Sequence, residues 1–302
     1  MIRVLHPGLF TTVQDSGRWG YQRFGIPVAG PMDPVSHRMA NLLVGNRPSC
    51  ATLEVTLAGP RLEFESDLLL AVCGAEFELL LDGEPVPGDT VLAARKGQRL
   101  AFGRRRQGAR AYIAAAGGFD VPRVLGSRAT HVGSGMGGVG GRALAAGDEL
   151  EAGDGIARRV RAGDSRKASA TAAGRVRVLP GPHDDRFGST GAVALEGRRY
   201  RVGAASDRMG YRLEGPPLEQ EGPELLSAAV PVGAIQVPPS GEPIILMADR
   251  PTTGGYPRIG TVISADVPVV AQLAPGEGIE FETCSHEAAV RALIEQERGL
   301  LA

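Results

Sequence analysis

Short runs of apolar residues, separated by turn-forming residues, dominate this chain of 302 residues. Examples are LEVTLAG (53–59), LLLAVCGAEFELLLDGEPV (68–86), TVLAARKGQRLAF (90–102) and ARAYIAAAGG (109–118). Apolar positions cluster or alternate within these runs, and Gly, Pro and Asp-Gly pairs interrupt them, as in β-hairpins. The 43 glycines and 22 prolines show no three-residue period, so they indicate many turns and not collagen. The pattern predicts a mainly β protein.

Two segments have the spacing of amphipathic helices. In MDPVSHRMANLLVGN (32–46), Asp33 can cap a helix, Pro34 suits its first turn and Gly45 ends it. Near the C-terminus, SHEAAVRALIEQERGLL (285–301) starts with Ser285 as a cap, and its apolar residues form a stripe. We therefore expect one helix inserted in the first half of the chain and one at its end.

A change of composition divides the chain. Residues 153–174 are small, polar and charged with little to bury, which makes them the best linker candidate. Short words recur in the same order on both sides: RWGY, IPVAG, EVTLAG and KGQRLAF before the linker, and RMGY, VPVGA, QVPPSG and PGEGIEF after it. We infer two similar β domains, residues 1–165 and 172–302, both closed or nearly closed barrels because closure removes sheet edges.

The charged residues exclude several classes of function. With 33 Lys and Arg against 34 Asp and Glu, the chain lacks the positive surface of a nucleic-acid-binding protein. Its lysines, Lys96 and Lys167, lie in neither a P-loop nor the Met-Lys-Met setting of a biotinyl lysine. We therefore expect neither a P-loop ATPase nor covalently bound biotin on this chain.

The cysteines and histidines predict no disulfide framework and no metal site. Cys50, Cys73 and Cys284 are far apart and outside any CxxC spacing, and the five histidines show no metal-ligand spacing. The first residues lack the apolar segment of a signal peptide, and no apolar run is long enough to cross a membrane. We expect a cytoplasmic protein without a membrane or nucleic-acid partner.

The stretch ADRPTTGGYP (248–257) carries the strongest signal for chemistry. An apolar run, 244–247, predicts a buried strand just before it. The polar or flexible residues that follow are Asp249, Arg250, Thr252, Thr253, Gly254, Gly255 and Tyr256. Adjacent glycines allow backbone N–H groups to approach an anion closely. The alternative is an ordinary hairpin turn, but a turn alone does not explain so many polar side chains together.

Two further polar segments contain an acidic residue close in sequence to an arginine and a glycine. TTVQDSGRWGYQ (11–22) contains Gln14, Asp15 and Arg18, and SDRMGYRLEG (206–215) contains Asp207 and Arg208. An Asp can hold a planar guanidinium ready for bidentate binding of a carboxylate or phosphate. The alternative is that each Asp and Arg pair only to close a loop.

Two other motifs favour a structural interpretation. GSGMGGVGG (133–141) has neither a clear strand before it nor a helix after it, so we expect a flexible flap and not a phosphate loop. His183 lies beside Asp184 and Asp185, which could orient it as a base, but a solvated loop histidine is the simpler interpretation.

Longer segments resemble one known family. They are GLFTTVQDSGRWGYQRFGIPVAGPMD (8–33), ARAYIAAAGGFDVPRVLGSRAT (109–130), SDRMGYRLEG (206–215), GAIQVPPSGEPIILMADRPTTGGYPRIGTVISAD (233–266) and VAQLAPGEGIEF (270–281). Together they resemble the biotin-dependent carboxyltransferase family that includes the C subunit of 5-oxoprolinase, KipA and allophanate hydrolase subunit 2. The resemblance extends over essentially the whole chain, and the 233–266 block is very specific.

The resemblance implies two tandem cyclophilin-like β-barrel domains with a few helices. It also implies a role as the C subunit of a 5-oxoprolinase complex, together with a cyclophilin-like B subunit of the PxpB/KipI type and an A subunit of the LamB/YcsF type. Such a complex opens 5-oxo-L-proline, a small-molecule amide, to L-glutamate with ATP, whose site need not lie on this chain. Two alternatives stay open: the carboxyltransferase component of a biotin-dependent urea or amide carboxylase with a separate biotin carrier, and a KipA-like non-catalytic regulator that binds a kinase inhibitor.

Both possible chemistries require a polarised amide or ureido carbonyl and a held anionic group. We expect Asp249 as general base, Arg208 as an anion clamp and Gln236 as a partner of the carbonyl. The expected substrate-binding residues are Gln14, Asp15, Arg18, Asp207, Arg250, Thr252, Thr253, Gly254, Gly255 and Tyr256. In this scheme Arg18 is a second anion clamp, and Asp15 and Asp207 orient the two arginines.

Overall fold

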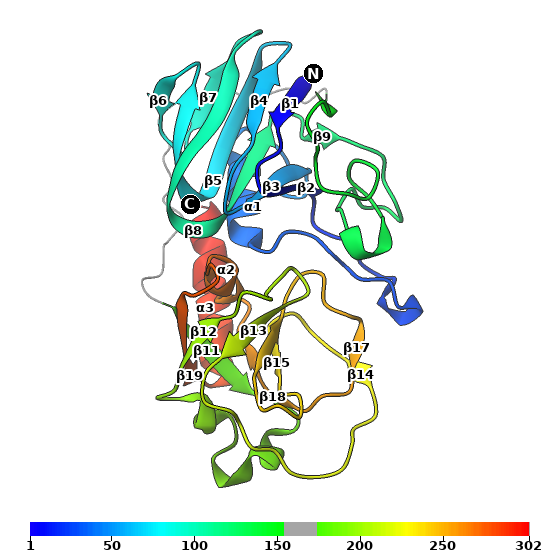
Figure 1. Ribbon diagram of the computed structural model, residues 1–302, viewed down its shortest axis with the longest axis vertical. Coiled ribbons are helices and arrows are strands. Elements are labelled where there is room, and N and C mark those ends of the chain that lie inside the picture. Colours follow the sequence, from blue (N-terminus) through cyan, green and yellow to red (C-terminus); the bar gives the residue numbers. More distant parts are fainter. Residues whose placement is uncertain (154–173, 302) are drawn as a thin grey trace. The chain divides into compact units, whose positions relative to one another are not determined.

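The computed structural model describes residues 1–153 and 174–301, which form two compact units (Figure 1). The first unit comprises residues 1–19 and, within the described chain, residues 29–153. The second comprises Gly20–Val28, with a 3₁₀ turn at Gln22–Phe24, and the described chain from residue 174. The expected domain boundary at 165–172 and almost all of the expected linker lie outside the described residues. Each unit is therefore described by itself.

The first unit is built on a ten-stranded sheet. Its strands are β1 (Ile2–His6), β2 (Phe10–Gln14), β3 (Thr52–Thr56), β4 (Arg61–Phe64), β5 (Leu68–Leu81), β6 (Glu84–Val86), β7 (Val91–Ala94), β8 (Arg99–Ala115), β9 (Phe119–Asp120) and β10 (Glu149–Ala152). The order is β2-β3-β8-β4-β1-β10-β9, and β5 pairs with β6, β7 and β8. Register shifts along the β5–β8 ladder bend these long strands around an apolar core.

The second unit contains a closed barrel in the order β11-β18-β15-β16-β13-β12-β19. These strands are β11 (Arg175–Pro180), β12 (Arg199–Val202), β13 (Gly210–Glu214), β15 (Ala234–Gln236), β16 (Ile244–Leu246), β18 (Arg258–Val262) and β19 (Gly278–Thr283). The last strand closes the barrel because β19 pairs in parallel with β11 and antiparallel with β12. A separate two-stranded sheet joins β14 (Ala228–Ala229) and β17 (Thr253–Gly254). The expected mainly β fold with two barrel-like sheets is confirmed.

Both predicted helices are present. Helix α1 (Pro34–Leu43) begins where Asp33 accepts hydrogen bonds from the backbone N–H groups of Val35 and Ser36. Helix α3 (His286–Leu301) begins where Ser285 Oγ accepts from Ala288 N at 3.2 Å. The capping residues therefore marked both starts correctly.

A third helix, α2 (Val267–Ala271), was not expected. It has 5 residues, most of them valine, so it is too short to show a helical period and its composition suggests a strand. Asp266 precedes it but makes no side-chain cap. Its carboxylate instead accepts from Nε and Nη2 of Arg177 at 2.9 and 2.7 Å, which ties the start of α2 to β11.

The glycine-rich segment 133–141 is folded tightly, contrary to the expected flexible flap. His131 and Met136 exchange backbone hydrogen bonds, and Gly138 N donates to Arg128 O. A Cβ at Gly137 would lie 2.0 Å from Ala129 O, so the main chain packs too closely here for any side chain. The glycines allow this packing, and the segment, with its 3₁₀ turn at Val132–Ser134, is an integral part of the first unit.

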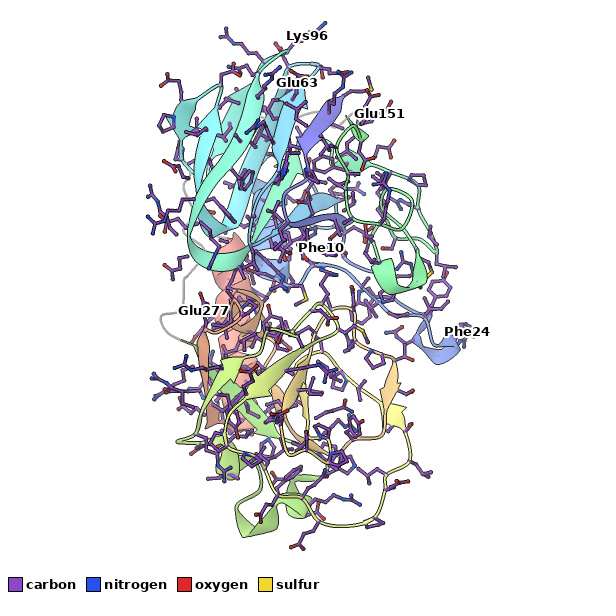
Figure 2. The ribbon with its side chains drawn as sticks, in the orientation of Figure 1. Phe10, Phe24, Glu63, Lys96, Glu151 and Glu277 are labelled. Atoms are coloured by element: carbon purple, nitrogen blue, oxygen red, sulfur yellow. The ribbon has the colours of Figure 1, made fainter. Side chains whose placement is uncertain are left out.

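The lysine in the described part of the chain lies at the surface. Lys96 occupies the turn between β7 and β8, is exposed, and its side chain extends away from the sheet (Figure 2). Lys167 lies outside the described residues. The described residues therefore include no buried lysine that could serve as a covalent nucleophile.

Helix α1 buries a histidine against the first sheet. His37 is 1% exposed, and its Nδ1 lies 2.8 Å from Thr52 Oγ1 on β3. Burial lowers the pKa of His37 from 6.5 to about 4, partly opposed by the nearby Asp15 and Glu54 carboxylates. Between these two values the unfolded chain binds a proton that the folded chain excludes.

The stability of the first unit should therefore fall as the pH falls from 6.5 to 4. The His37 contribution to the free energy of unfolding should drop by about 3 kcal/mol over this window, since one pKa unit corresponds to about 1.4 kcal/mol. The measurement is urea denaturation at several pH values for the wild type and His37→Gln. The variant should lose this pH dependence, whereas His286→Gln at the exposed start of α3 should retain it. An unchanged slope in His37→Gln would contradict the assignment.

Candidate functional site

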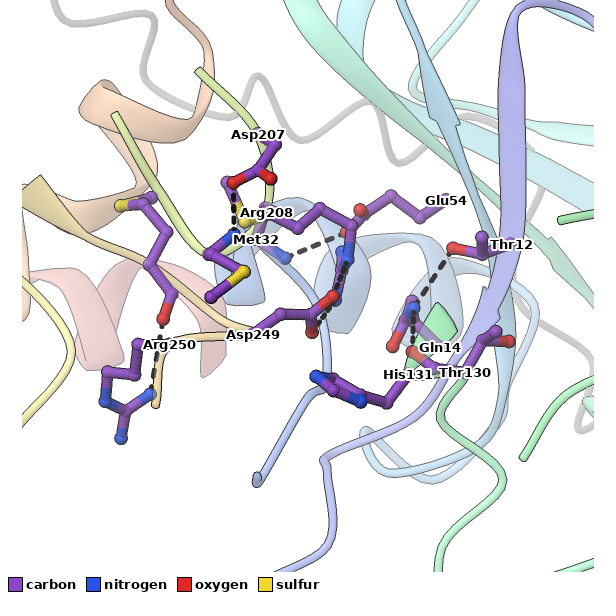
Figure 3. A network of polar contacts seen from close by, with 12 residues as sticks. Thr12, Gln14, Met32, Glu54, Thr130, His131, Asp207, Arg208, Asp249 and Arg250 are labelled. Atoms are coloured by element: carbon purple, nitrogen blue, oxygen red, sulfur yellow. Dashed lines mark hydrogen bonds and ion pairs between the residues drawn. The ribbon is translucent and has the colours of Figure 1, made fainter. Parts of the chain in front are cut away.

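A buried ion pair lies at one end of two neighbouring barrel strands of the second unit. Arg208 precedes β13 and Asp249 follows β16, and the strands pair antiparallel with Gly210 opposite Leu246. Asp249 N donates to Arg208 O at 2.8 Å. The guanidinium then donates from Nε to Oδ2 and from Nη2 to Oδ1, both at 2.9 Å (Figure 3). With side chains only 8% and 9% exposed, this is a bidentate pair shielded from water.

Asp207 has a different role from the one expected. Its Oδ1 accepts hydrogen bonds from Met209 N at 2.8 Å and Gly210 N at 3.2 Å. The carboxylate thus closes a turn in which an Asp side chain binds its own backbone two residues on. Asp249, and not Asp207, orients Arg208, which corrects the expected pairing.

The loop after Asp249 is organised by backbone contacts. Arg250 Nε donates to Val230 O at 3.0 Å, and burial lowers the pKa of its guanidinium. Thr252 O accepts from Val230 N, and Thr253–Gly254 forms β17 against β14. Tyr256 is 47% exposed. The segment is therefore a small sheet that presents side chains, and not a plain hairpin turn.

Gln236 is the last residue of β15 and is 4% exposed. Its Nε2 has no hydrogen-bond partner in the described structure, although a buried donor is normally satisfied. A Cβ at Gly254 would lie 2.6 Å from this Nε2, so the absence of a side chain at Gly254 makes room for the amide. Gln236 pairs with Ile244 at the start of β16, whereas Asp249 follows the end of that strand. The structure thus groups Gln236 with Gly254, and Arg208 with Asp249.

The first unit contains a second buried glutamine at a strand end. Gln14 closes β2 and is fully buried. Its Nε2 donates to Thr12 Oγ1 and Thr130 O, both at 3.0 Å, as Figure 3 shows. These two acceptors fix the amide orientation. Oε1 is left with no partner among the described residues.

Asp15 and Arg18 serve the loops around Gln14. The Asp15 carboxylate accepts from Gly17 N at 3.0 Å and from Ser127 Oγ and Arg128 N at 2.6 Å. Arg18 is fully buried, and it donates from Nε to Val124 O and from Nη2 to Ala129 O. The expected orientation of Arg18 by Asp15 is therefore corrected: both side chains hold the 124–130 segment.

A buried acid that the sequence did not indicate lies on β3. Glu54 is fully buried and accepts from Met32 N at 2.8 Å and from Tyr112 OH at 2.7 Å. Tyr112 OH in turn accepts from Asp33 N, and burial followed by the Glu54 charge raises the pKa of the phenol. Nearly every residue of β3 is buried, so no alternation of polar and apolar residues distinguished Glu54. Its signal was only an acid within an otherwise uncharged strand.

His183 is held by the backbone and not by its acidic neighbours. Its Nδ1 accepts from Arg258 N at 3.1 Å. Burial, then Arg258 and Arg186, lower the pKa of the imidazole. Asp184 accepts instead from Ala192 N within the 3₁₀ region Asp184–Leu195. The geometry favours a structural role for this histidine.

The described part of the chain contains neither a metal-binding group nor a membrane-spanning helix. No group of three or more His, Cys, Asp or Glu residues there could hold a metal ion. No helix in the same part is long and apolar enough to span a membrane.

Comparison with known proteins places this architecture in one family. Residues 24–283 match the family model described as "Carboxyltransferase domain, subdomain A and B", and the chain belongs to this family. It is 41% identical over 307 residues to the C subunit of 5-oxoprolinase from Escherichia coli K12, covering 99% of this chain and 96% of that protein. It is 40% identical to the C subunit of 5-oxoprolinase from Haemophilus influenzae, covering 96% of this chain and 94% of that protein.

Larger proteins contain a similar region. The urea amidolyase of Lachancea kluyveri is 33% identical over 95% of this chain, which spans only 17% of that protein. In the crystal structure of the Kluyveromyces lactis urea amidolyase, the matching region has a TM-score of 0.91 at 32% identity and makes up 20% of the chain. The crystal structure of TTHA0988 matches this chain with a TM-score of 0.84 at 38% sequence identity. The match covers 93% of this chain and 55% of the TTHA0988 chain.

The buried ion pair leads to a stability prediction. Asp249→Asn should lower the free energy of unfolding by about 3 kcal/mol because it removes the charge of one partner in a buried pair. Asp207→Asn is the matched control and should cost less than about 0.5 kcal/mol, since an amide oxygen can accept the same two backbone hydrogen bonds. Urea denaturation of the whole chain measures both. Equal losses in the two variants would show that the pair contributes nothing beyond the turn.

Proposed function

We propose that this chain is one component of a 5-oxoprolinase complex that opens 5-oxo-L-proline to L-glutamate with ATP. Its similarity to two proteins named as C subunits of 5-oxoprolinase extends over nearly the whole of each chain. We further propose that the complex contains two partners, a cyclophilin-like protein of the PxpB/KipI type and a protein of the LamB/YcsF type. ATP is assigned here to the complex and to no residue of this chain.

One observation carries the chemical part of the proposal: the buried and unpartnered N–H of Gln236. A buried donor without an acceptor costs about 1–3 kcal/mol of stability, and such a cost is typical of functional sites that a ligand completes. An amide carbonyl is a matching acceptor, and a donor aimed at its oxygen stabilises the negative charge that develops during ring opening. We assign this role to Gln236.

The other amide supports the same substrate class. Gln14 Oε1 is a buried acceptor without a described partner, which suits the N–H of a cyclic amide. We assign Gln14 to substrate binding, with Asp15 and Arg18 supporting the loops around it.

Arg208 is our candidate for holding the anionic group of the substrate. Its guanidinium is fixed by Asp249, so little side-chain freedom is lost when it binds a carboxylate. Both oxygens of Asp249 accept from this guanidinium, which favours a positioning role for Asp249 over the general-base role expected from the sequence. The residues proposed to face the substrate are Arg250, Thr252, Thr253, Gly254, Gly255 and Tyr256, and Asp207 is proposed to support them by shaping the turn beside Arg208.

Carboxyl transfer is the second candidate function. The family description and the TM-score of 0.91 with the urea amidolyase structure favour it. Since we expect no biotin attached to this chain, a separate carrier would have to supply it. A KipA-like regulator that binds a kinase inhibitor is the non-catalytic alternative.

Reconstitution tests the leading proposal. This chain is co-expressed with candidate partners of the two proposed types, the assembled complex is purified, and glutamate formed from 5-oxoproline is measured with and without ATP. We expect ATP-dependent glutamate that disappears when this chain is omitted. An assembled complex that forms no glutamate would refute the proposal. Carboxylation of urea with a biotin carrier would then support the second candidate.

Substitution of a glycine beside Gln236 tests the role of this amide. Gly254→Ala would place a Cβ 2.6 Å from Gln236 Nε2 and displace the amide. We expect kcat for glutamate formation to fall by about 100-fold, as when one oxyanion donor is removed. Gly299→Ala in α3 is the control, because no heavy atom lies within 4 Å of the place where its Cβ would be. A Gly254→Ala complex with the kcat of the control would exclude Gln236 from catalysis.

A further inference from the structure

A cavity of about 450 Å³ lies within the first unit. It is lined by the loop after β2, the segment before β3, the β8–β9 turn and the segment that follows β9. The residues that give it its chemistry are Asp15, Arg47, Cys50, Asp120, Arg123 and Arg128. Of the candidate site residues above, only Asp15 lines this cavity.

Both acids on the wall are already engaged. Asp15 accepts from Ser127 Oγ and from the Gly17 and Arg128 backbone N–H groups. Asp120 pairs with Arg128 Nη2, and Arg128 Nε donates to Val121 O at 2.9 Å. These contacts neutralise Arg128 and hold it in place. The charge of Asp120 is therefore balanced by Arg128, and Asp15, whose partners are neutral donors, is the one carboxylate charge left on the wall.

Arg47 and Arg123 carry the remaining positive charge of the wall, two charges against the single charge of Asp15. Both are exposed, and neither forms a salt bridge or side-chain hydrogen bond within the described residues. Gly126 lines the same cavity with φ of +82°, and no heavy atom lies within 4 Å of the place where its Cβ would be. Gly126 is exposed and leaves open space on a wall that also carries two guanidiniums, whose N–H donors suit oxyanions.

We propose that this cavity binds a small organic oxyanion with two negative charges, a phosphate ester or a dicarboxylate. The planar guanidinium forks of Arg47 and Arg123 match the oxygen spacing of either group. The volume falls in the range of sites for small organic molecules, so the cavity has room for more than a bare ion. The wall includes Asp15 but none of the residues proposed for catalysis, and the proposal does not depend on the proposed function.

Cys50 provides a direct readout. It lines the cavity and is partly exposed, whereas Cys73 is buried. Cys284 is partly exposed and belongs to the second unit, so it serves as an internal reference. A bound anion should shield Cys50 from an alkylating reagent and leave the rate at Cys284 unchanged.

The experiment measures alkylation of both cysteines by mass spectrometry in the full-length chain. The probes are glycerol phosphate and succinate, with succinamide as the uncharged analogue and sodium chloride at equal ionic strength. We expect one or both dianions to slow the reaction at Cys50 severalfold, and the two controls to have no effect. Protection by one dianion only would identify the phosphate or the dicarboxylate form of the site.

Substitutions locate the binding groups. Arg47→Gln and Arg123→Gln should each raise the dianion concentration needed for half-protection by about tenfold, as expected for the loss of one hydrogen bond to a charged group. The matched control is Arg104→Gln, which changes an exposed arginine on β8 and should leave the concentration for half-protection unchanged. Lack of protection in the wild type, equal protection by chloride, or undiminished protection in the double variant would each overturn the proposal.

Discussion

Burying a guanidinium and a carboxylate costs several kcal/mol per ion unless the two are paired with good geometry. The second unit meets this requirement with Arg208 and Asp249, which lie 41 residues apart in the sequence. They meet because β13 and β16 pair with Gly210 opposite Leu246, and because Asp249 N donates to Arg208 O. A one-residue slip would turn the side chains to opposite faces of the sheet. The candidate site therefore depends on strand register. In the closed barrel β13 and β16 are each paired on both sides, and these pairings together fix the register.

The two units use their strand ends in a similar way. Gln14 closes β2 and Gln236 closes β15, and each carries one buried amide atom without a described partner. Neighbouring acids, Asp15 and Asp207, bind backbone N–H groups and shape the turns. The polar residues of these segments thus fall into two groups: those that set the geometry of the loops and those that are available to a ligand. This division favours amide recognition over a general-base mechanism at Asp249.

Much of the fold followed from local signals. Asp33 and Ser285 marked the starts of α1 and α3, and short apolar runs between turns indicated the β structure. Helix α2 was missed because five residues cannot show a helical period. The glycine-rich segment 133–141 was interpreted as a flap, since its close contacts with Ala129 and Arg128 are invisible without the fold. The recurring words also lie differently: Arg18 follows β2, whereas Arg208 precedes β13.

The sequence by itself determined the class of fold, the two predicted helices and the polar residues that gather after the strand at 244–246. These properties follow from capping, turn chemistry and hydrophobic pattern, which act over a few residues. Only the tertiary structure decided that Asp249 and not Asp207 holds Arg208, that Glu54 is buried beside Tyr112, and that Gln236 lies against Gly254. Side-chain partners depend on the register of strands far apart in the chain, and no local pattern encodes that register.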